Sequence, residues 1–126
     1  MSKKIYDVYM CGPVEFGPKQ FTAENVTESL HQLQKCVDGY IECVYLFDNG
    51  KDFEDEDYRE YSMICNEEGL IREMPYLLTI EDTADIYGPA VIGVYNNEGD
   101  LCEFTEEDIV RIESYIIEHI TDREDM

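Results

Sequence analysis

Apolar residues in this chain come in short runs, separated by turns that contain glycine or acidic residues. Five runs are rich in β-branched and aromatic residues, a composition that favours strands. They span residues 4–10, 40–47, 61–65, 90–95 and 101–104. Two further segments repeat apolar residues at helical spacing, each after a threonine suited to capping. This order predicts an α+β fold, in which two helices are packed on one face of a mostly antiparallel sheet.

The first helix is expected to begin after Thr22. This residue would cap the helix, and Phe21 would pack on Val26 as a hydrophobic staple. The helix should end at Asp38-Gly39, because glycine readily adopts the left-handed backbone that closes a helix. Its apolar stripe is expected to be buried and comprises Val26, Leu30, Leu33 and Val37.

The last helix has the clearer start. Thr105 is expected to cap it, Asp108 to complete a capping box, and Phe104 to pack on Ile109. Its apolar stripe comprises Ile109, Ile112, Ile116 and Ile120, widened by Val110 and Ile117. Acidic residues between these positions are therefore expected to face water.

Three segments have weaker patterns. Residues 11–21 contain two Gly-Pro pairs and are expected to form a loop or a short irregular hairpin. The turn at 66–69 contains glycine and is expected to lead into Leu70-Ile71 as a hairpin. Residues 76–88 follow a proline and have no clear period, and a short helical turn around 80–84 is the expectation there.

A chain of 126 residues has room for one domain, residues 1–126, and none for a second core. It contains no apolar run of membrane-spanning length, and its first residues lack the apolar stretch of a secretory leader. We therefore expect a cytoplasmic protein with no membrane partner.

The sequence carries no pattern that indicates catalysis, a metal or a cofactor. Its five cysteines form no paired motif and are expected to be reduced and mostly buried, and His31 and His119 are expected to be structural. No nucleophile–base signature and no phosphate-binding glycine motif occurs. We therefore expect a protein that is not an enzyme and that binds no metal or cofactor.

The charge of the chain is its strongest functional clue. Thirty acidic residues against nine basic ones give a net charge of −21. This charge opposes direct binding to nucleic acid or to anionic lipid. A compact domain of this length has a diameter of about 35 Å, and a duplex of that length carries about 20 phosphate charges. The protein thus resembles in charge the segment of duplex that it would replace.

Part of the chain resembles a known family. The residues concerned are Val37-Asp38-Gly39-Tyr40-Ile41-Glu42, then Asn66-Glu67-Glu68-Gly69, Pro75 and Ile92-Gly93. This progression is similar to a family of small uncharacterised proteins of bacteriophages and mobile elements, over Leu33–Gly93, about half the chain. Asp38 stands where glycine is usual, and Leu77 where asparagine is usual. The resemblance implies no activity, but it implies a bacterial host.

Together, charge and resemblance favour a phage-encoded counter-defence inhibitor. It would act as an acidic nucleic-acid mimic on a basic nucleic-acid-binding host protein, such as a bacterial immune protein of the restriction or CRISPR type. Carboxylates would steer and pair with the partner, and two aromatic residues would anchor the contact. The predicted partner-binding residues are Asp52, Phe53, Glu54, Asp55, Glu56, Asp57, Tyr58, Glu106, Glu107 and Glu113.

Two other interpretations stay open. The chain could be a binding module that sequesters a nucleotide immune signal, with phosphate held near the loop Gly12–Pro18 by basic residues. The candidates are Lys3, Lys4, Lys19 and Arg72. It could also be a regulatory phage protein without catalysis, or a chain whose acidic surface serves only solubility. The sequence leaves a homodimer open.

Overall fold

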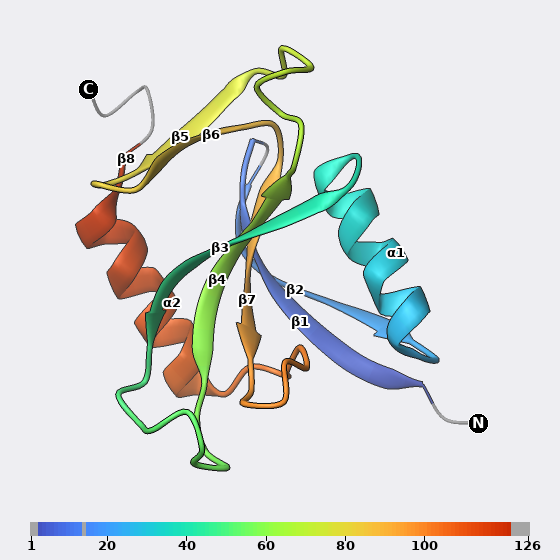
Figure 1. The fold of residues 1–126 in the computed structure, drawn as a ribbon, viewed down its shortest axis with the longest axis vertical. Helices are drawn as coiled ribbons and strands as arrows, with labels where there is room; N and C mark the ends of the chain where they lie inside the picture. The colour runs from blue at the N-terminus through green and yellow to red at the C-terminus, as the bar shows by residue number, and fades with distance from the viewer. Residues whose placement is uncertain (1–2, 14, 122–126) are drawn as a thin grey trace.

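The computed structural model describes residues 3–13 and 15–121, which form ten helices and strands (Figure 1). They are β1 (Lys4–Cys11), β2 (Phe16–Ala23), α1 (Val26–Val37), β3 (Ile41–Asp48), β4 (Glu60–Asn66), β5 (Tyr76–Ile80), β6 (Ala84–Tyr87), β7 (Ala90–Tyr95), α2 (Glu106–His119) and β8 (Ile120–Thr121). One sheet has the strand order β2-β1-β7-β4-β3 and the other β6-β5-β8, and all pairs are antiparallel. The predicted α+β class with antiparallel sheets is confirmed.

The two helices lie on opposite faces of the five-stranded sheet. In β4, the side chain of Ile64 belongs to the cluster that contains Leu33 of α1. Its neighbours Met63 and Cys65 belong to the cluster that contains Ile112 of α2. Successive side chains of a strand point to opposite faces, so the expectation that both helices cover one face is wrong. The reason is that β4 is buried on both sides, and each side needs its own cover.

The three-stranded sheet lies on the α2 side. Leu78, Ile80 and Ile86 of β5 and β6 are buried in the same cluster as Ile112. β8 continues directly from α2 and pairs with β5. The α2 face of the large sheet is therefore covered by a helix and a second sheet, whereas α1 and Leu101, from the segment after β7, cover the other face.

Residues 16–23 form a strand, where a loop or irregular hairpin was expected. β2 pairs with β1 over its full length, and it is the edge of the sheet, where Pro18 breaks no ladder on a second side. Thr22 lies in this strand, so it does not cap α1. The cap is Asn25, whose Oδ1 accepts a hydrogen bond from the Glu28 N–H at 2.9 Å.

The apolar stripe of α1 is only half buried. Leu33 and Val37 lie in the core, but the side chains of Val26 and Leu30 are 72% and 38% exposed. The helix ends at Asp38, which has the left-handed φ of 60°. Aspartate tolerates this conformation better than most residues, which explains how it can stand where glycine is usual.

The expectations for residues 66–88 were wrong in two places. Leu70 and Ile71 form turns and are exposed, so no hairpin strand follows the turn at 66–69. Residues 76–88 contain the β5–β6 hairpin where a helical turn was expected. Asp82, in the turn of this hairpin, has φ of 57°. The expected strand at 101–104 is reduced to a single bridge, between Tyr95 and Leu101.

The start of α2 is as predicted. Thr105 caps the helix, and Asp108 completes the capping box. Ile112 is fully buried, but Val110 and Ile117 are 61% and 84% exposed, so they do not widen the buried stripe. Among residues 3–13 and 15–121, no helix combines the length and the apolar character needed to cross a membrane. All five cysteines are free, two are buried and Cys43 is exposed.

Candidate partner-binding site

The acidic insert, residues 49–59, connects β3 to β4 and is ordered by its own hydrogen bonds. The Asn49 N–H donates to the Arg59 carbonyl at 3.0 Å, and Asn49 Nδ2 donates to the Asp57 carbonyl at 2.8 Å. At the tip, the Tyr58 N–H donates to the Asp55 carbonyl, and the Asp55 carboxylate accepts from the Asp57 N–H at 2.7 Å. Asp55 is therefore partly occupied in holding the loop.

Most of the predicted site residues of the insert face water. Asp52, Glu54, Glu56 and Asp57 are exposed, and Asp55 is half-buried. Phe53 is 61% exposed and lies edge-on to the Tyr58 ring at 5.1 Å between centroids.

Tyr58 does not fit the predicted role of an anchor for a partner. Its side chain is only 7% exposed, and its hydroxyl donates to Glu60 Oε1 at 3.0 Å. Burial, together with this bond, raises the pKa of Tyr58 to about 12. The buried Tyr58 ring packs against Phe53 just before the chain enters β4. Tyr58 is therefore a structural residue of the insert.

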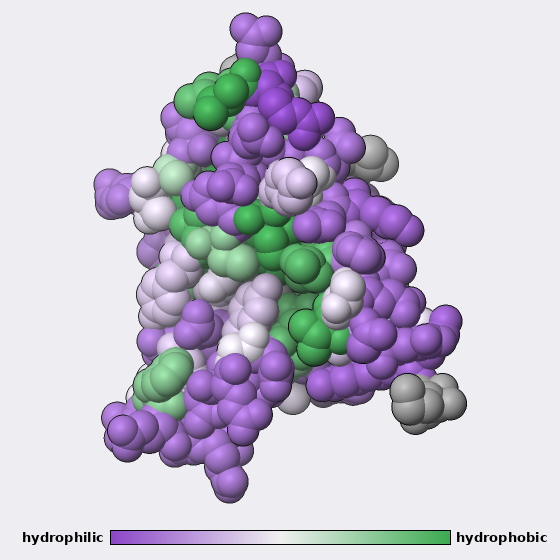
Figure 2. Space-filling model, turned by 45° about the vertical axis from the view of Figure 1, so that its right-hand side comes forward, coloured by the Kyte–Doolittle hydropathy of each residue, from purple (hydrophilic) through white to green (hydrophobic). Residues whose placement is uncertain are grey.

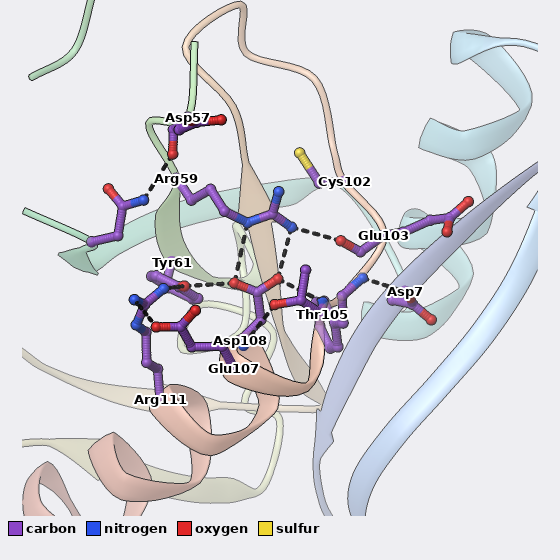
Figure 3. A network of polar contacts seen from close by, with 12 residues as sticks. Asp7, Asp57, Arg59, Tyr61, Cys102, Glu103, Thr105, Glu107, Asp108 and Arg111 are labelled. Atoms are coloured by element: carbon purple, nitrogen blue, oxygen red, sulfur yellow. Dashed lines mark hydrogen bonds and ion pairs between the residues drawn. The ribbon is translucent and has the colours of Figure 1, made fainter. Parts of the chain in front are cut away.

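The side chain of Arg59 is directed toward Asp108 at the start of α2 (Figure 3). Its Nε donates to Asp108 Oδ1 at 3.1 Å, and its Nη2 to Asp108 Oδ2 at 2.7 Å and to the Glu103 carbonyl at 2.6 Å. This bidentate pair joins the end of the insert to the first turn of α2. Arg59 is therefore unavailable to neutralise the carboxylates of the insert.

Asp108 is the most densely bonded residue of this region, and its side chain is fully buried. Besides Arg59, it accepts from the Tyr61 hydroxyl at 2.6 Å and from the Thr105 N–H at 2.8 Å. Burial alone would raise the pKa of Asp108, but the bonds from Thr105, Tyr61 and Arg59 outweigh it and hold the pKa below its usual range. Asp108 is therefore ionised and structural, not part of the acidic surface.

The network extends along α2 to Arg111. Arg111 Nη1 donates to the Tyr61 hydroxyl at 3.0 Å, and Nη2 donates to Glu107 Oε1 at 2.5 Å. Burial, with the bond to Asp108, raises the pKa of Tyr61 to about 12. Glu107, predicted to meet a partner, is thus already paired within its own helix.

The other two helix residues of the predicted site differ. Glu106 is exposed at the first turn of α2, as predicted for an acidic residue outside the apolar stripe of this helix. Glu113 lies two turns further, and its Oε2 accepts a hydrogen bond from the Tyr9 hydroxyl at 2.8 Å. Burial and this bond raise the pKa of Tyr9 to about 12. Glu113 therefore joins α2 to β1 and is not part of the region around the insert.

The structure brings the insert and the start of α2 to the same end of the molecule, at the bottom of Figure 1. Besides the Arg59–Asp108 pair, Asn97 Nδ2 donates to the Asp55 carbonyl at 3.1 Å and joins the insert to the loop before α2. We call this region the acidic end. Its exposed carboxylates are Asp52, Glu54, Glu56, Asp57, Glu98, Asp100, Glu103, Glu106 and Glu107, the last of which is paired with Arg111.

The basic residues considered for a nucleotide site are not gathered. Arg72 Nη1 donates to the Asp38 carbonyl at 2.8 Å, and Lys19 lies on the edge strand β2. Lys4 alone of the four lines a cavity of about 410 Å³ between α1 and the sheet. Figure 2 shows hydrophobic side chains in a hollow on the face that includes α1, surrounded by hydrophilic ones. This arrangement offers no cluster of cations for phosphate.

The described residues contain no group of three or more His, Cys, Asp and Glu side chains that could hold a metal ion. The acidic end therefore differs from a metal site, in which carboxylates converge on one point. Its side chains are spread over a surface instead. The arrangement is suited to pairing with several separate cations of a partner.

Sequence reasoning missed the contact between Arg59 and Asp108. Two signals were present: Arg59 is the one arginine of the insert, and Asp108 stands at the third position of a capped helix. Neither signal gives the contact, since these residues are 49 positions apart and meet only when β4 packs on α2.

Comparison with known proteins gives a family and no function. Searches of the curated proteins and of the solved structures found no match. A family described as a domain of unknown function, DUF3846, matches residues 7–117. This range reaches into β1 and α2, beyond the Leu33–Gly93 segment that carries the resemblance seen in the sequence. Because the match covers most of the chain, the protein belongs to the DUF3846 family.

Proposed function

We propose that the acidic end binds a basic, nucleic-acid-binding protein and competes with nucleic acid for that protein's groove. The observation that carries the proposal is the joining of two acidic segments, the insert and the start of α2, at one end of the domain. Carboxylates imitate phosphate oxygens as partners for Arg and Lys. Such a protein acts by occupancy and needs no catalytic group.

The charges of this end are available to a partner. Of the two cations in the insert, Arg59 is turned inward onto Asp108, which leaves Lys51 as the one exposed cation there. Asp52, Glu54 and Glu56 project from the same loop, and no cation among residues 3–13 and 15–121 forms an ion pair with them. Such unpaired surface charges accelerate association with an oppositely charged groove.

The resemblance to bacteriophage and mobile-element proteins favours action in the cytoplasm of a bacterial host. There, nucleic-acid-binding immune proteins of the restriction or CRISPR type offer basic grooves of the right kind. Inhibition of such a protein would make this chain a counter-defence factor.

The test compares two neutralised variants with equal loss of charge. The first carries Asp52→Asn, Glu54→Gln, Glu56→Gln and Asp57→Asn, and it leaves Asp55 to hold the loop. The control carries Glu67→Gln, Glu68→Gln, Glu73→Gln and Asp82→Asn, which are exposed and lie between β4 and β6. Each immobilised protein is exposed to a nuclease-treated bacterial lysate, and bound proteins are eluted with duplex DNA, with RNA or with salt.

We expect the wild type and the control to retain a protein that nucleic acid displaces, and the insert variant to lose it. Retention should weaken as salt rises, because exposed charge pairs are screened over about 8–10 Å. Equal retention by the insert variant would contradict the proposal. So would a partner that holds nucleic acid and this protein together with both affinities unchanged.

A further inference from the structure

The five-stranded sheet has two edges, and they are protected very differently. Both edge strands, β2 and β3, have eight residues. β2 carries Gly17, Pro18 and Lys19 in its first half, and such residues hinder the pairing of another strand with an edge. β3 contains no proline, lysine or arginine. Its register shift lies between Tyr45 and Phe47, so the part from Ile41 to Tyr45 is regular.

The register of β3 shows which of its backbone groups are free to pair. The Tyr40 carbonyl accepts from the Glu67 N–H at 2.9 Å, so these two residues form a hydrogen-bonded pair. In an antiparallel ladder such pairs alternate along the strand. Glu42 and Val44 therefore bond to β4, and the N–H and C=O groups of Ile41, Cys43 and Tyr45 point away from it. Within the described residues, β4 is the one strand that pairs with β3.

The side chains of this edge favour a basic partner. Glu42 is exposed, and β3 leads through Asp48 directly into the acidic insert. No lysine or arginine lies on the strand. Tyr45 is 53% exposed and Tyr40, just before the strand, is 67% exposed, so flat apolar surface accompanies the acidic charge. Aromatic side chains of this kind often contribute strongly to interfaces.

We infer that the outer edge of β3 takes up an extended basic segment of the partner as an additional strand of the sheet. Backbone hydrogen bonds from Ile41, Cys43 and Tyr45 would provide the pairing, and Glu42 with the insert would select lysine or arginine at alternate positions. A second copy of this chain is the poorer occupant, because each edge carries Glu42 and no lysine or arginine, so two edges of like charge would face each other. The inference rests on the proposed function and adds the mode of contact.

The test uses an octapeptide of alternating lysine and valine as the probe. Controls are the glutamate–valine peptide and a lysine–valine peptide with a central proline. We expect the lysine–valine peptide to bind and to slow amide exchange at Ile41, Cys43 and Tyr45, measured by NMR. Exchange at Glu42 and Val44, already bonded to β4, should change little. Binding without protection of the three outward amides would overturn the inference, and so would equal binding of the proline peptide.

A pair of variants isolates the backbone contribution. Cys43→Pro removes one outward N–H and leaves the bonds to β4, whereas Cys43→Ser keeps the N–H and loses the thiol. We expect Cys43→Pro to weaken peptide binding by about fivefold to tenfold, since the loss of one backbone hydrogen bond costs about that factor. Cys43→Ser should bind like the wild type. Equal binding by both variants would overturn the inference. If Cys43→Pro does not fold, the amide-exchange experiment on the wild type decides.

Two outcomes separate this inference from the proposed function. If the neutralised insert abolishes nucleic-acid-sensitive capture but the edge amides stay unprotected, the proposed function stands and strand addition is wrong. If the purified chain instead doubles its mass at high concentration, with protection of the same amides, the occupant of the edge is a second copy and the inference is also wrong. Sedimentation at low and high concentration supplies this measurement.

Discussion

The two helices begin with similar local chemistry in very different surroundings. In α1, Asn25 caps the helix, and Glu28 Oε2 accepts from the Glu24 N–H at 3.1 Å. In α2, Thr105 caps the helix, and Asp108 accepts from the Thr105 N–H at 2.8 Å. Glu28 stays at the surface, whereas Asp108 is fully buried and bonded to β4.

This difference separates a helix whose first turn is bonded into the core from one whose first turn lies at the surface. α2 is joined to β4 by the Arg59–Asp108 pair and buries Ile112 completely. α1 buries Leu33 and Val37, near its end, and leaves Leu30 partly exposed beside the cavity. Helices with similar capping residues are therefore expected to contribute differently to the free energy of unfolding, and substitutions can measure this difference.

The largest expected effect is at Ile112. Ile112→Asp places a charge without a partner in the α2 side of the core, and we expect a loss of several kcal/mol, about 4 or more, enough to unfold the protein or make it aggregate. Leu30→Asp on α1 should cost only about 1 kcal/mol, because aspartate there can reach water. Thermal and urea denaturation measure both. Similar losses at the two positions would break the distinction between the helices.

The next effect compares the two acidic residues in the first turns. Asp108→Ala leaves Arg59 without its buried partner, and we expect the free energy of unfolding to fall by about 3–5 kcal/mol. Glu28→Ala removes a surface cap contact and should cost about 0.5–1 kcal/mol. Urea denaturation at neutral pH gives both values. If Asp108→Ala costs no more than Glu28→Ala, the buried network contributes nothing beyond ordinary capping.

The smallest effect concerns acid pH. The folded structure lowers the pKa of Asp108, so its ionised form stabilises the fold at pH values above its unfolded value near 3.8. This stabilisation is lost as the pH falls through the lower, folded pKa. The Asp108→Asn variant, though less stable at pH 7, should therefore lose less stability than the wild type between pH 5 and pH 2. The free energy of unfolding, measured across this range, checks the sign, and parallel curves would contradict it.

Local sequence patterns predicted where helices and strands lie better than which of their side chains are buried. The capping box at Thr105 and the end of α1 at Asp38 could be predicted, because each depends on residues within one turn. The start of α1 could not be predicted, because threonine and asparagine both suit a helix cap. Thr22 is paired with Ile5 of β1 and lies in a strand, so the cap is Asn25. Such pairing depends on residues far away in the sequence.

The predicted site shows the same division. The exposure of Asp52, Glu54 and Glu56 follows from composition, because carboxylates without a buried partner stay in water. The burial of Tyr58 and the pairing of Glu113 with Tyr9 do not, since both depend on how distant strands meet. The sequence did contain a local indication that the helices lie on opposite faces of the sheet, because β4 has apolar residues on both of its faces.

The hydrogen bonds within the insert have a consequence for the thermodynamics of association. Ordering one backbone residue costs about 1–2 kcal/mol in conformational entropy. Asn49 bonds to the carbonyl of Asp57, Asp55 to the N–H of Asp57, and Asn97 to the carbonyl of Asp55, so this cost is met when the domain folds. A partner that bound the acidic end, as we propose, would therefore meet a loop whose backbone is already ordered, and its binding free energy would carry little penalty for loop ordering.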